Sequence, residues 1–417
     1  MLTTDRQIDR RILLEADSLE AAGWTVTILA TQVDSARGDE DSRVVRPPSG
    51  SSVATRENPV FRGYRWVRRV IPMDGFVMSV LKRFAWRYLI DQEAFFTRLL
   101  ADAAERYSPD VFVAHDLPML PLAWQQAARC GAKLVYDSHE LYCEQEFSKH
   151  EKKCWAQIES RYIGRCDAVI TVNVSIAAEL EKRYGIRDVG VIYNADRASS
   201  PPAYTKLFHT IFALPESTRV LLLQGGLSAG RNLESLIEGM AHVRDDSIVL
   251  VVLGDGPMSK ILASRVQSLG LSRRVFFHAA VPQEDLSRYT VAADAGVIPY
   301  LATCLNNYFC TPNKLFEFIA AGLPILASDL PEIAKMVKGR SIGLVGDMSG
   351  AVSIGRLVEE FFFDEVCLAE WRRNASLARE EVCWEVEGGK LVAIYDAVMK
   401  MPPSFLSDTT KAGERAR

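Results

Sequence analysis

The 417-residue sequence lacks the patterns of a membrane span, a disulfide framework and a dedicated metal site. No apolar run reaches the roughly 18 residues that a membrane-spanning helix requires. The eight cysteines are scattered without a C-x-x-C pair, and no signal peptide precedes them, so we expect free thiols in a cytosolic protein. The six histidines show no ligand spacing such as H-E-x-x-H, so we expect no dedicated metal site. We expect no cofactor either.

The sequence also lacks a large excess of charge of either sign. The formal net charge is −4 and the pI is near 6.0, which gives no support to a nucleic-acid-binding role. The hydrophobic fraction of 48% and the charged fraction of 24% are those of an ordinary soluble globular protein. A chain of this length exceeds one ordinary core, so two domains are expected.

Short, nearly continuous apolar runs alternate with helical stretches, which is typical of strands buried on both faces of a parallel sheet. Five runs precede a break rich in Ser and Pro, namely 25–30, 110–116, 132–138, 167–173 and 189–195. Six runs follow it, namely 219–226, 247–256, 274–280, 294–300, 323–329 and 341–347. We predict an α/β fold with two doubly wound parallel-sheet domains at 1–196 and 218–385, a linker at 197–217, and a closing helix and tail at 386–417.

The N-terminus departs from this scheme. A helix begins near Ile8, and the seven residues before it leave no room for a strand. A doubly wound domain normally opens with a strand, so we expect the leading strand to be missing.

Two loops of the second half follow a strand and precede a helix, where α/β proteins bind ligands. In "LLLQGGLSAGR", Gly225 and Gly226 allow close backbone approach and Arg231 stands at the start of a helix. Such a helix start suits a phosphate, although the glycines alone also fit an ordinary strand–turn–helix connection. The nearby "LGDGP" contains G-x-G without the rest of a dinucleotide fingerprint, so it gives little support to a dehydrogenase.

The second loop is "TPNKLFEFIAAGLPILASD", residues 311–329. Thr311, Pro312 and Asn313 begin a helix, and Lys314 and Glu317 share one of its faces. The pair is either a surface ion pair or a grip on a ligand, in which Lys314 meets phosphate and Glu317 meets a ribose diol.

Histidines and carboxylates end two strands of the first half. His139 and Glu140 follow the strand at 132–138, and His115 and Asp116 end the strand at 110–116. At the carboxyl end of a parallel strand, each histidine either contacts a substrate or is a core residue held by a neighbour such as Asp137.

Residues 59–100 mix basic and aromatic side chains. The segment either rests on an anionic membrane surface or grips a lipid-linked substrate, or it forms helices that pack on the sheet with a solvated basic rim.

In order, these pieces resemble the GT-B glycosyltransferases, in particular the GT4-like family that uses nucleotide-diphosphate sugars. The resemblance rests on "AHDLPMLPLAW", "KLVYDSHELY", "LLLQGGLSAGRNLESLIEGM", "VLGDGP", "AADAGVIPY" and "TPNKLFEFIAAGLPILASD" and runs from about residue 5 to 395. It implies two Rossmann-like domains facing a cleft, with the acceptor on the first and the donor on the second.

The resemblance also implies roles for individual residues. The catalytic set would be His139, Arg231 and Lys314. The donor would be held by Gly225, Gly226, Arg231, Asp255, Thr311, Asn313, Lys314 and Glu317. The acceptor side would include His115, Asp116, His139 and Glu140. The earlier glutamate of the family's E-x(7)-E motif is replaced by Phe309, with Asn306 and Asn307 the nearest polar residues, so the sugar of the donor must be held differently.

The function that follows is a metal-independent, retaining glycosyltransferase that moves a sugar from a nucleotide-diphosphate sugar to a glycan or lipid-linked acceptor. Surface polysaccharide synthesis at the inner face of the membrane is the expected setting. Two alternatives remain open, a sugar-nucleotide epimerase of the same fold and a non-catalytic nucleotide-binding partner protein.

Overall fold

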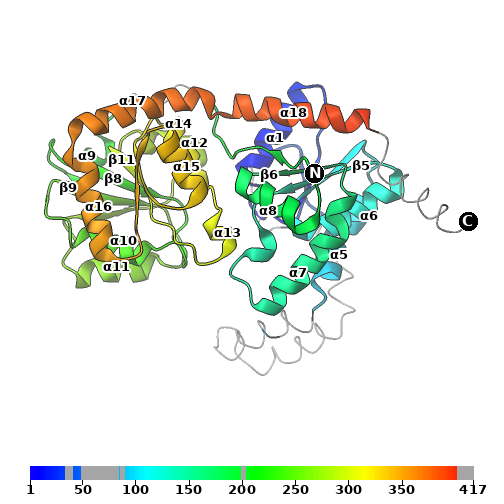
Figure 1. The fold of residues 1–417 in the computed structure, drawn as a ribbon, viewed down its shortest axis with the longest axis horizontal. Coiled ribbons are helices and arrows are strands. Elements are labelled where there is room, and N and C mark those ends of the chain that lie inside the picture. The colour runs from blue at the N-terminus through cyan, green and yellow to red at the C-terminus, as the bar shows by residue number, and fades with distance from the viewer. Residues whose placement is uncertain (33–40, 48–83, 85–89, 199–202, 402–417) are drawn as a thin grey trace, which may run out of the picture. The chain divides into compact units, whose positions relative to one another are not determined.

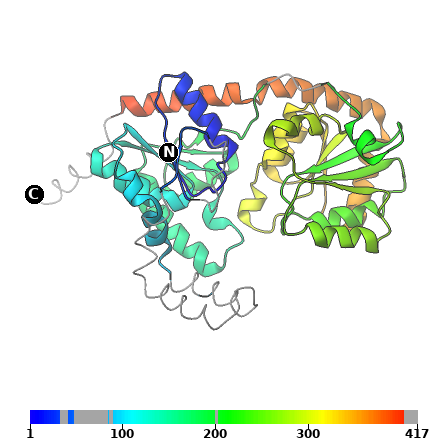
Figure 2. The same ribbon diagram turned by 180° about the vertical axis from the view of Figure 1, so that it is seen from behind.

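The computed structural model describes residues 1–32, 41–47, 84, 90–198 and 203–401. The chain forms two compact units, the first made of Met1–Ile192 together with the chain from Gly388 onward, the second of Tyr193–Glu387. Each unit holds one parallel sheet with helices on both faces (Figures 1 and 2). The predicted α/β class with two doubly wound sheets is confirmed.

The first sheet has the strand order β3-β2-β1-β4-β5-β6-β7. Its strands are β1 (Leu2–Thr3), β2 (Ile28–Ala30), β3 (Val44–Val45), β4 (Val111–His115), β5 (Lys133–Ser138), β6 (Ala168–Thr171) and β7 (Gly190–Val191). The prediction of a missing leading strand is wrong, because β1 pairs with Leu29 of β2 on one side and Ala114 of β4 on the other. Two residues suffice because backbone pairing on both sides buries Leu2 completely in the sheet.

The second sheet has the order β10-β9-β8-β11-β12-β13. Its strands are β8 (Arg219–Gln224), β9 (Ile248–Leu253), β10 (Val275–His278), β11 (Ala295–Ile298), β12 (Ile325–Ser328) and β13 (Gly343–Gly346). All eleven strands predicted from the apolar runs are present. The inner strands β5, β9, β11 and β12 are buried throughout, which is why the sequence shows continuous apolar runs there rather than alternation. The edge strands β7, β10 and β13 are largely half-buried.

Helices connect the strands. In the first unit they are α1 (Arg10–Ala21), α5 (Gln92–Ala104), α6 (Leu120–Cys130), α7 (Lys149–Tyr162) and α8 (Val174–Tyr184). In the second they are α9 (Leu207–Phe212), α10 (Leu233–Met240), α11 (Ser259–Ser268), α12 (Gln283–Thr290), α13 (Leu305–Tyr308), α14 (Asn313–Ala320), α15 (Pro331–Gly339), α16 (Ala351–Phe363) and α17 (Glu365–Glu381). The predicted linker therefore contains a helix, α9, whose Phe208 lies in the core of the second unit.

The chain returns to the first unit through α18 (Trp384–Lys400), the predicted closing helix. Its Tyr395 ring meets the Trp24 ring edge to face at 5.7 Å, just beyond the end of α1. Its Ile394 reaches the backbone of Gly190 in β7. From Gly388 onward, the C-terminal helix is thus an integral part of the first unit rather than a separate appendage.

Each sheet changes winding direction at one point. In the first sheet this point lies between β1 and β4, and in the second between β8 and β11. The connections from such neighbouring strands leave toward opposite sides, and this opens a crevice at the carboxyl ends of the strands. The topology therefore selects the loops after β8 and β11, and those after β1 and β4, as binding positions.

Helix α14 is fixed in the second unit by its apolar face. Leu315, Phe316, Phe318 and Ile319 are fully buried in the core under the sheet. The Phe318 ring lies so close to β11 that a Cβ on Gly296 would come within 2.4 Å of it. This tight packing determines which way the polar face of α14 points.

Among the described residues, no helix combines the length and the apolar content that a crossing of the membrane requires. All eight cysteines are free thiols, as expected. Most of segment 59–100 lies outside the described residues, so its contact with a membrane stays a prediction.

Phe316 offers a test of the α14 packing. Replacing this buried ring with alanine should lower the free energy of unfolding by about 3–5 kcal/mol, because a cavity would be left in the core. The matched control is Phe363→Ala in the same unit, whose side chain is 89% exposed and should change stability by less than about 0.5 kcal/mol. Calorimetric melting of both variants measures the difference; equal losses would contradict the packing described.

Candidate functional sites in the two units

In the second unit, the loop after β8 meets the loop after β9 backbone to backbone. Leu227 N–H donates to the Asp255 carbonyl at 2.9 Å, and Met258 N–H donates to the Leu227 carbonyl at 3.0 Å. A Cβ on Gly254 would lie 2.1 Å from the Gly225 oxygen, and Gly254 has φ +146°. The G-x-G of this region therefore supports the glycine loop after β8 rather than a cofactor of its own.

Two cations converge at this glycine loop. The Lys314 side chain passes over Gly225, where a Cβ would lie 3.8 Å from its Cε. Arg231 donates from Nη1 to the Gly226 carbonyl at 3.2 Å. Both cations face the Tyr300 ring, with Lys314 Nζ at 5.2 Å and the Arg231 guanidinium carbon at 5.8 Å from its centroid.

Lys314 is buried although it is a lysine. Burial, together with the charge of Arg231, lowers the pKa of its ammonium to about 7, and Glu317 opposes this shift only in part. Two like charges held together inside a protein destabilise it unless an anion is brought between them. The arrangement therefore favours a negatively charged ligand at the carboxyl ends of β8 and β11.

The other predicted residues of this loop take distinct places. Thr311 is buried, whereas Asn313 is exposed and accepts a hydrogen bond from Asn194 at 3.2 Å. Glu317, one turn after Asn313, accepts a hydrogen bond from Gln224 Nε2 at 2.5 Å. The structure thus brings Gly225, Gly226, Arg231, Lys314 and Glu317 together around the end of β8.

Asp255 has a different environment. Its carboxylate accepts a hydrogen bond from the Ala280 N–H at 2.9 Å and so ties the loop after β9 to the loop after β10. The replaced motif position, Phe309, follows α13, and its ring lies at a tilt against that of Tyr308, with ring centroids 5.0 Å apart. Asn306 is buried, and Asn307 donates to the Thr303 hydroxyl at 2.6 Å.

Sequence reasoning missed Asn232, the residue that follows Arg231 and precedes α10. This residue adopts a left-handed conformation, φ +57°, just before α10. Its amide donates to the carbonyls of Pro299, at 3.0 Å, and Met348, at 2.7 Å. An asparagine before an amphipathic run signals a helix cap, but its long-range partners depend on the fold.

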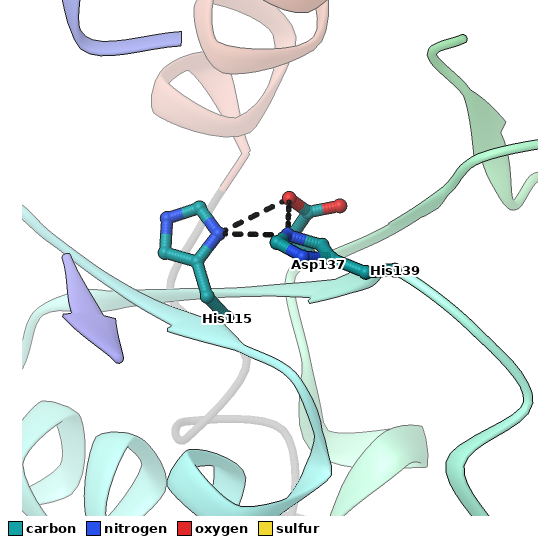
Figure 3. A group of neighbouring side chains, drawn as sticks. All are labelled: His115, Asp137 and His139. Carbon is teal, nitrogen blue, oxygen red and sulfur yellow. Dashed lines mark hydrogen bonds and ion pairs between the residues drawn. The ribbon is translucent and has the colours of Figure 1, made fainter. Parts of the chain in front are cut away.

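In the first unit, Asp137 collects four hydrogen bonds at the end of β5. Arg11 donates from Nη2 to Oδ1 at 2.9 Å and from Nε to Oδ2 at 3.0 Å. His139 Nε2 lies 2.8 Å and His115 Nδ1 lies 3.1 Å from the same Oδ2 (Figure 3). Asp137 is fully buried, and these partners hold the pKa of its carboxyl well below the usual range despite burial.

The two histidines differ in protonation. Burial opposes a charge on His139, but the carboxylates of Asp116 and Asp137 outweigh it and raise its pKa to about 10. Burial dominates at His115 and lowers its pKa to about 4. One neutral and one charged imidazole therefore lie 3.2 Å apart between His115 Nδ1 and His139 Nε2.

Asp116 and Glu140 flank His139. The Asp116 carboxylate accepts a hydrogen bond from the His139 N–H at 3.1 Å and lies 3.6 Å from its Nδ1. Burial raises the pKa of Asp116 to about 7, and its backbone has φ +63°, a strained conformation for a residue other than glycine. Glu140 accepts a hydrogen bond from Gln145. All four predicted acceptor-side residues thus lie together at the ends of β4 and β5.

The group His115, Asp137 and His139 has the residue types of a metal site, with one ligand atom from each within 4.8 Å of the others. Asp137 accepts four hydrogen bonds, two from Arg11 and one from each histidine, which is about the full capacity of a carboxylate. Arg11 therefore already occupies part of the carboxylate that a metal ion would need.

Arg11 was not identified from the sequence. It stands in the first turn of α1, forms an ion pair with buried Glu15 at 2.9 Å and donates to the Ile192 carbonyl at 2.7 Å. Burial and the nearby Asp137 charge raise the pKa of Glu15 well above its usual value. No local pattern marks this arginine, because its partner Asp137 lies 126 positions away.

The protonation states of this cluster can be measured by NMR of the imidazole nitrogens. His139 should remain charged at pH 8, with a pKa of about 10, while His115 should remain neutral at pH 6, with a pKa of about 4. In Asp137→Asn the pKa of His139 should fall, because one of its two carboxylates is neutralised. Two histidines titrating together near ~6.5 would contradict the assignment.

Comparisons with known proteins agree with this architecture. Residues 8–195 match the family model described as Glycosyltransferase Family 4, and residues 218–356 match that of Glycosyl transferases group 1. Among curated relatives, the chain is 24% identical over 221 residues to the chitobiosyldiphosphodolichol beta-mannosyltransferase of Candida albicans, covering 49% of this chain and 48% of that protein. It is 22% identical to the 2-deoxystreptamine glucosyltransferase of Streptomyces kanamyceticus, covering 58% and 63%. The chain thus spans about half to two thirds of these relatives.

Solved structures are similar over nearly the whole chain. Sucrose-phosphate synthase from Thermosynechococcus elongatus superposes with a TM-score of 0.72 at 17% identity, covering 95% of this chain and 98% of that one. HepE from Anabaena in complex with UDP-glucose gives 0.67 at 14% identity with the same coverage. The chain has two parallel sheets, and the glycine loop and both cations lie where the second sheet changes winding direction. Because both family models also match, the chain belongs to the GT4-like family of GT-B glycosyltransferases.

Proposed function

We propose that this protein transfers a sugar from a nucleotide-diphosphate sugar to a glycan or lipid-linked acceptor, with retention of the anomeric configuration and without a metal. The observation that carries the proposal is the pair Lys314 and Arg231, two cations converging at the Gly225–Gly226 loop. Such a pair is complementary to the diphosphate of a donor.

The leaving group of this reaction is a nucleoside diphosphate, so catalysis requires stabilisation of the charge that develops on it. Lys314 and Arg231 would supply that stabilisation together with the N-terminus of α14, where free backbone N–H groups and Asn313 lie. Glu317 would receive the hydroxyls of the ribose. UDP is the proposed nucleotide, because HepE has been crystallised with UDP and UDP-glucose.

In the first unit, His139, Asp116 and Glu140 are the proposed contacts to sugar hydroxyls, with His115 behind them. The charge of His139 suits donation to a hydroxyl or to an oxygen that gains negative charge. Asp116, with a pKa of about 7, can accept a proton from an acceptor hydroxyl near neutral pH.

The proposal extends to a cytoplasmic protein that acts at the inner face of the membrane in surface glycan synthesis. Two relatives by name act on lipid-linked molecules, the Candida enzyme and the alpha-monoglucosyldiacylglycerol synthase of Streptococcus pneumoniae. Contact of segment 59–100 with anionic lipid rests on its sequence alone.

Donor binding is tested by calorimetry with UDP, GDP and ADP. Lys314→Ala and Glu317→Ala should each weaken binding of the preferred nucleotide by about 1–3 kcal/mol, the contribution of a charged hydrogen bond. The matched control Lys335→Ala, on the exposed side of α15, should bind as wild type does. Unchanged binding in both site variants would place the nucleotide elsewhere.

Transfer is tested separately with a radiolabelled donor sugar and lipid-linked acceptors. His139→Ala should lower transfer while leaving nucleotide affinity nearly intact, because the histidine belongs to the other unit. NMR of the product should show the anomeric configuration of the donor, and an inverted product would overturn the retaining mechanism. Nucleotide binding without transfer to any acceptor would identify a non-catalytic protein instead.

Lys314 should also make nucleotide binding depend on protons. Its pKa of about 7 leaves it mostly neutral at pH 8, and a bound diphosphate favours the charged form, so binding at pH 8 should take up about one proton. Below pH 6 the lysine is already charged and uptake should vanish. Titrations in buffers of different ionisation enthalpy measure this; Lys314→Met should abolish the uptake, and its persistence in that variant would exclude Lys314 as the source.

A further inference from the structure

A polar chain of three buried or half-buried side chains runs behind the proposed nucleotide site. Gln224, the last residue of β8, is 1% exposed and donates from Nε2 to Glu317 Oε2 at 2.5 Å. Its Oε1 accepts a hydrogen bond at 2.9 Å from the hydroxyl of Thr290, the last residue of α12, which is also buried. These hydrogen bonds link β8, α12 and α14.

Strand geometry explains why Gln224 points toward α14. Alternate residues of β8 face the same side of the sheet, and Val220 and Leu222 on this side pack in the core that also contains Phe316 and Phe318 of α14. Gln224 continues that row as its polar member at the carboxyl end. The next residue, Gly225, lies against Lys314, so the end of β8 contacts both charged side chains of α14, Lys314 and Glu317.

The orientation of the amide is determined by its partners. A carboxylate can only accept, so the Gln224 NH₂ must face Glu317, and the amide oxygen must face the Thr290 hydroxyl. Thr290 in turn lies 2.9 Å from the Leu286 carbonyl within α12. A neutral donor of this kind holds the carboxylate in place without neutralising its charge.

We propose that Gln224 is a positioning residue for nucleotide recognition, which holds the Glu317 carboxylate in the orientation that receives the two ribose hydroxyls of the donor. The inference rests on the proposed function, in which Glu317 binds that ribose. A carboxylate has about four acceptor positions, so the bond from Gln224 selects an orientation and still leaves acceptor capacity for a diol. Thr290 acts one step further back by fixing the amide.

The experiment compares UDP with 2′,3′-dideoxy-UDP, which lacks the diol, by calorimetry on the full chain. Gln224→Met keeps the length of the side chain and removes its hydrogen bonds. It should weaken UDP about tenfold, the effect of one lost hydrogen bond to a charged group, and change dideoxy-UDP by less than about twofold. Thr290→Val should show the same selective loss at about threefold. The exposed Gln267→Met on α11 is the matched control and should change neither affinity.

A purely structural role for Gln224 predicts equal loss for both nucleotides, and that outcome would overturn the inference, as would unchanged UDP affinity in Gln224→Met. Glu317→Gln separates this failure from failure of the proposed function. If Glu317→Gln loses the preference for UDP while Gln224→Met keeps it, the ribose site stands and the inference fails. If the wild type binds UDP and dideoxy-UDP equally, or neither, the ribose assignment itself fails and the inference fails with it.

Discussion

The winding reversal of the second sheet between β8 and β11 is the constraint on which the proposed donor site depends. Parallel strands place all their carboxyl ends at one edge, and the reversal leaves room there for a ligand. The glycine loop after β8 and helix α14, which follows β11 after the short helix α13, both begin at this edge. Close backbone contact between the loops after β8 and β9 requires glycine at position 254, and main-chain hydrogen bonds join the two loops.

Charge gives that position its chemical character. Lys314 is buried beside Arg231, a placement that hydrophobic packing alone would not favour. The apolar face of α14, packed against β11, forces Lys314 toward the loop. The packing of the helix therefore offsets the cost of burying a lysine whose pKa is lowered. Such perturbed pKa values are common at functional sites.

The first unit also buries a charged side chain, but there the buried charge is negative. Asp137 is the buried charge, and Arg11, His115 and His139 surround it. Removing one partner of such a group leaves an uncompensated buried charge and therefore lowers stability. His139 is thereby presented as a cation at the end of β5, beside the carboxylate of Asp116.

The sequence by itself determined the α/β class, eleven of the thirteen strands found in the described residues, and the loops that carry Gly225, Arg231, Lys314 and Glu317, because apolar runs and helix starts are local signals. It misjudged β1, since a two-residue strand has no periodicity to detect. Only the tertiary structure decided that Arg11 meets Asp137 and that Gln224 meets Glu317. These partners lie 126 and 93 positions apart, and side chains so distant in sequence become neighbours only when the strands are ordered in the sheet.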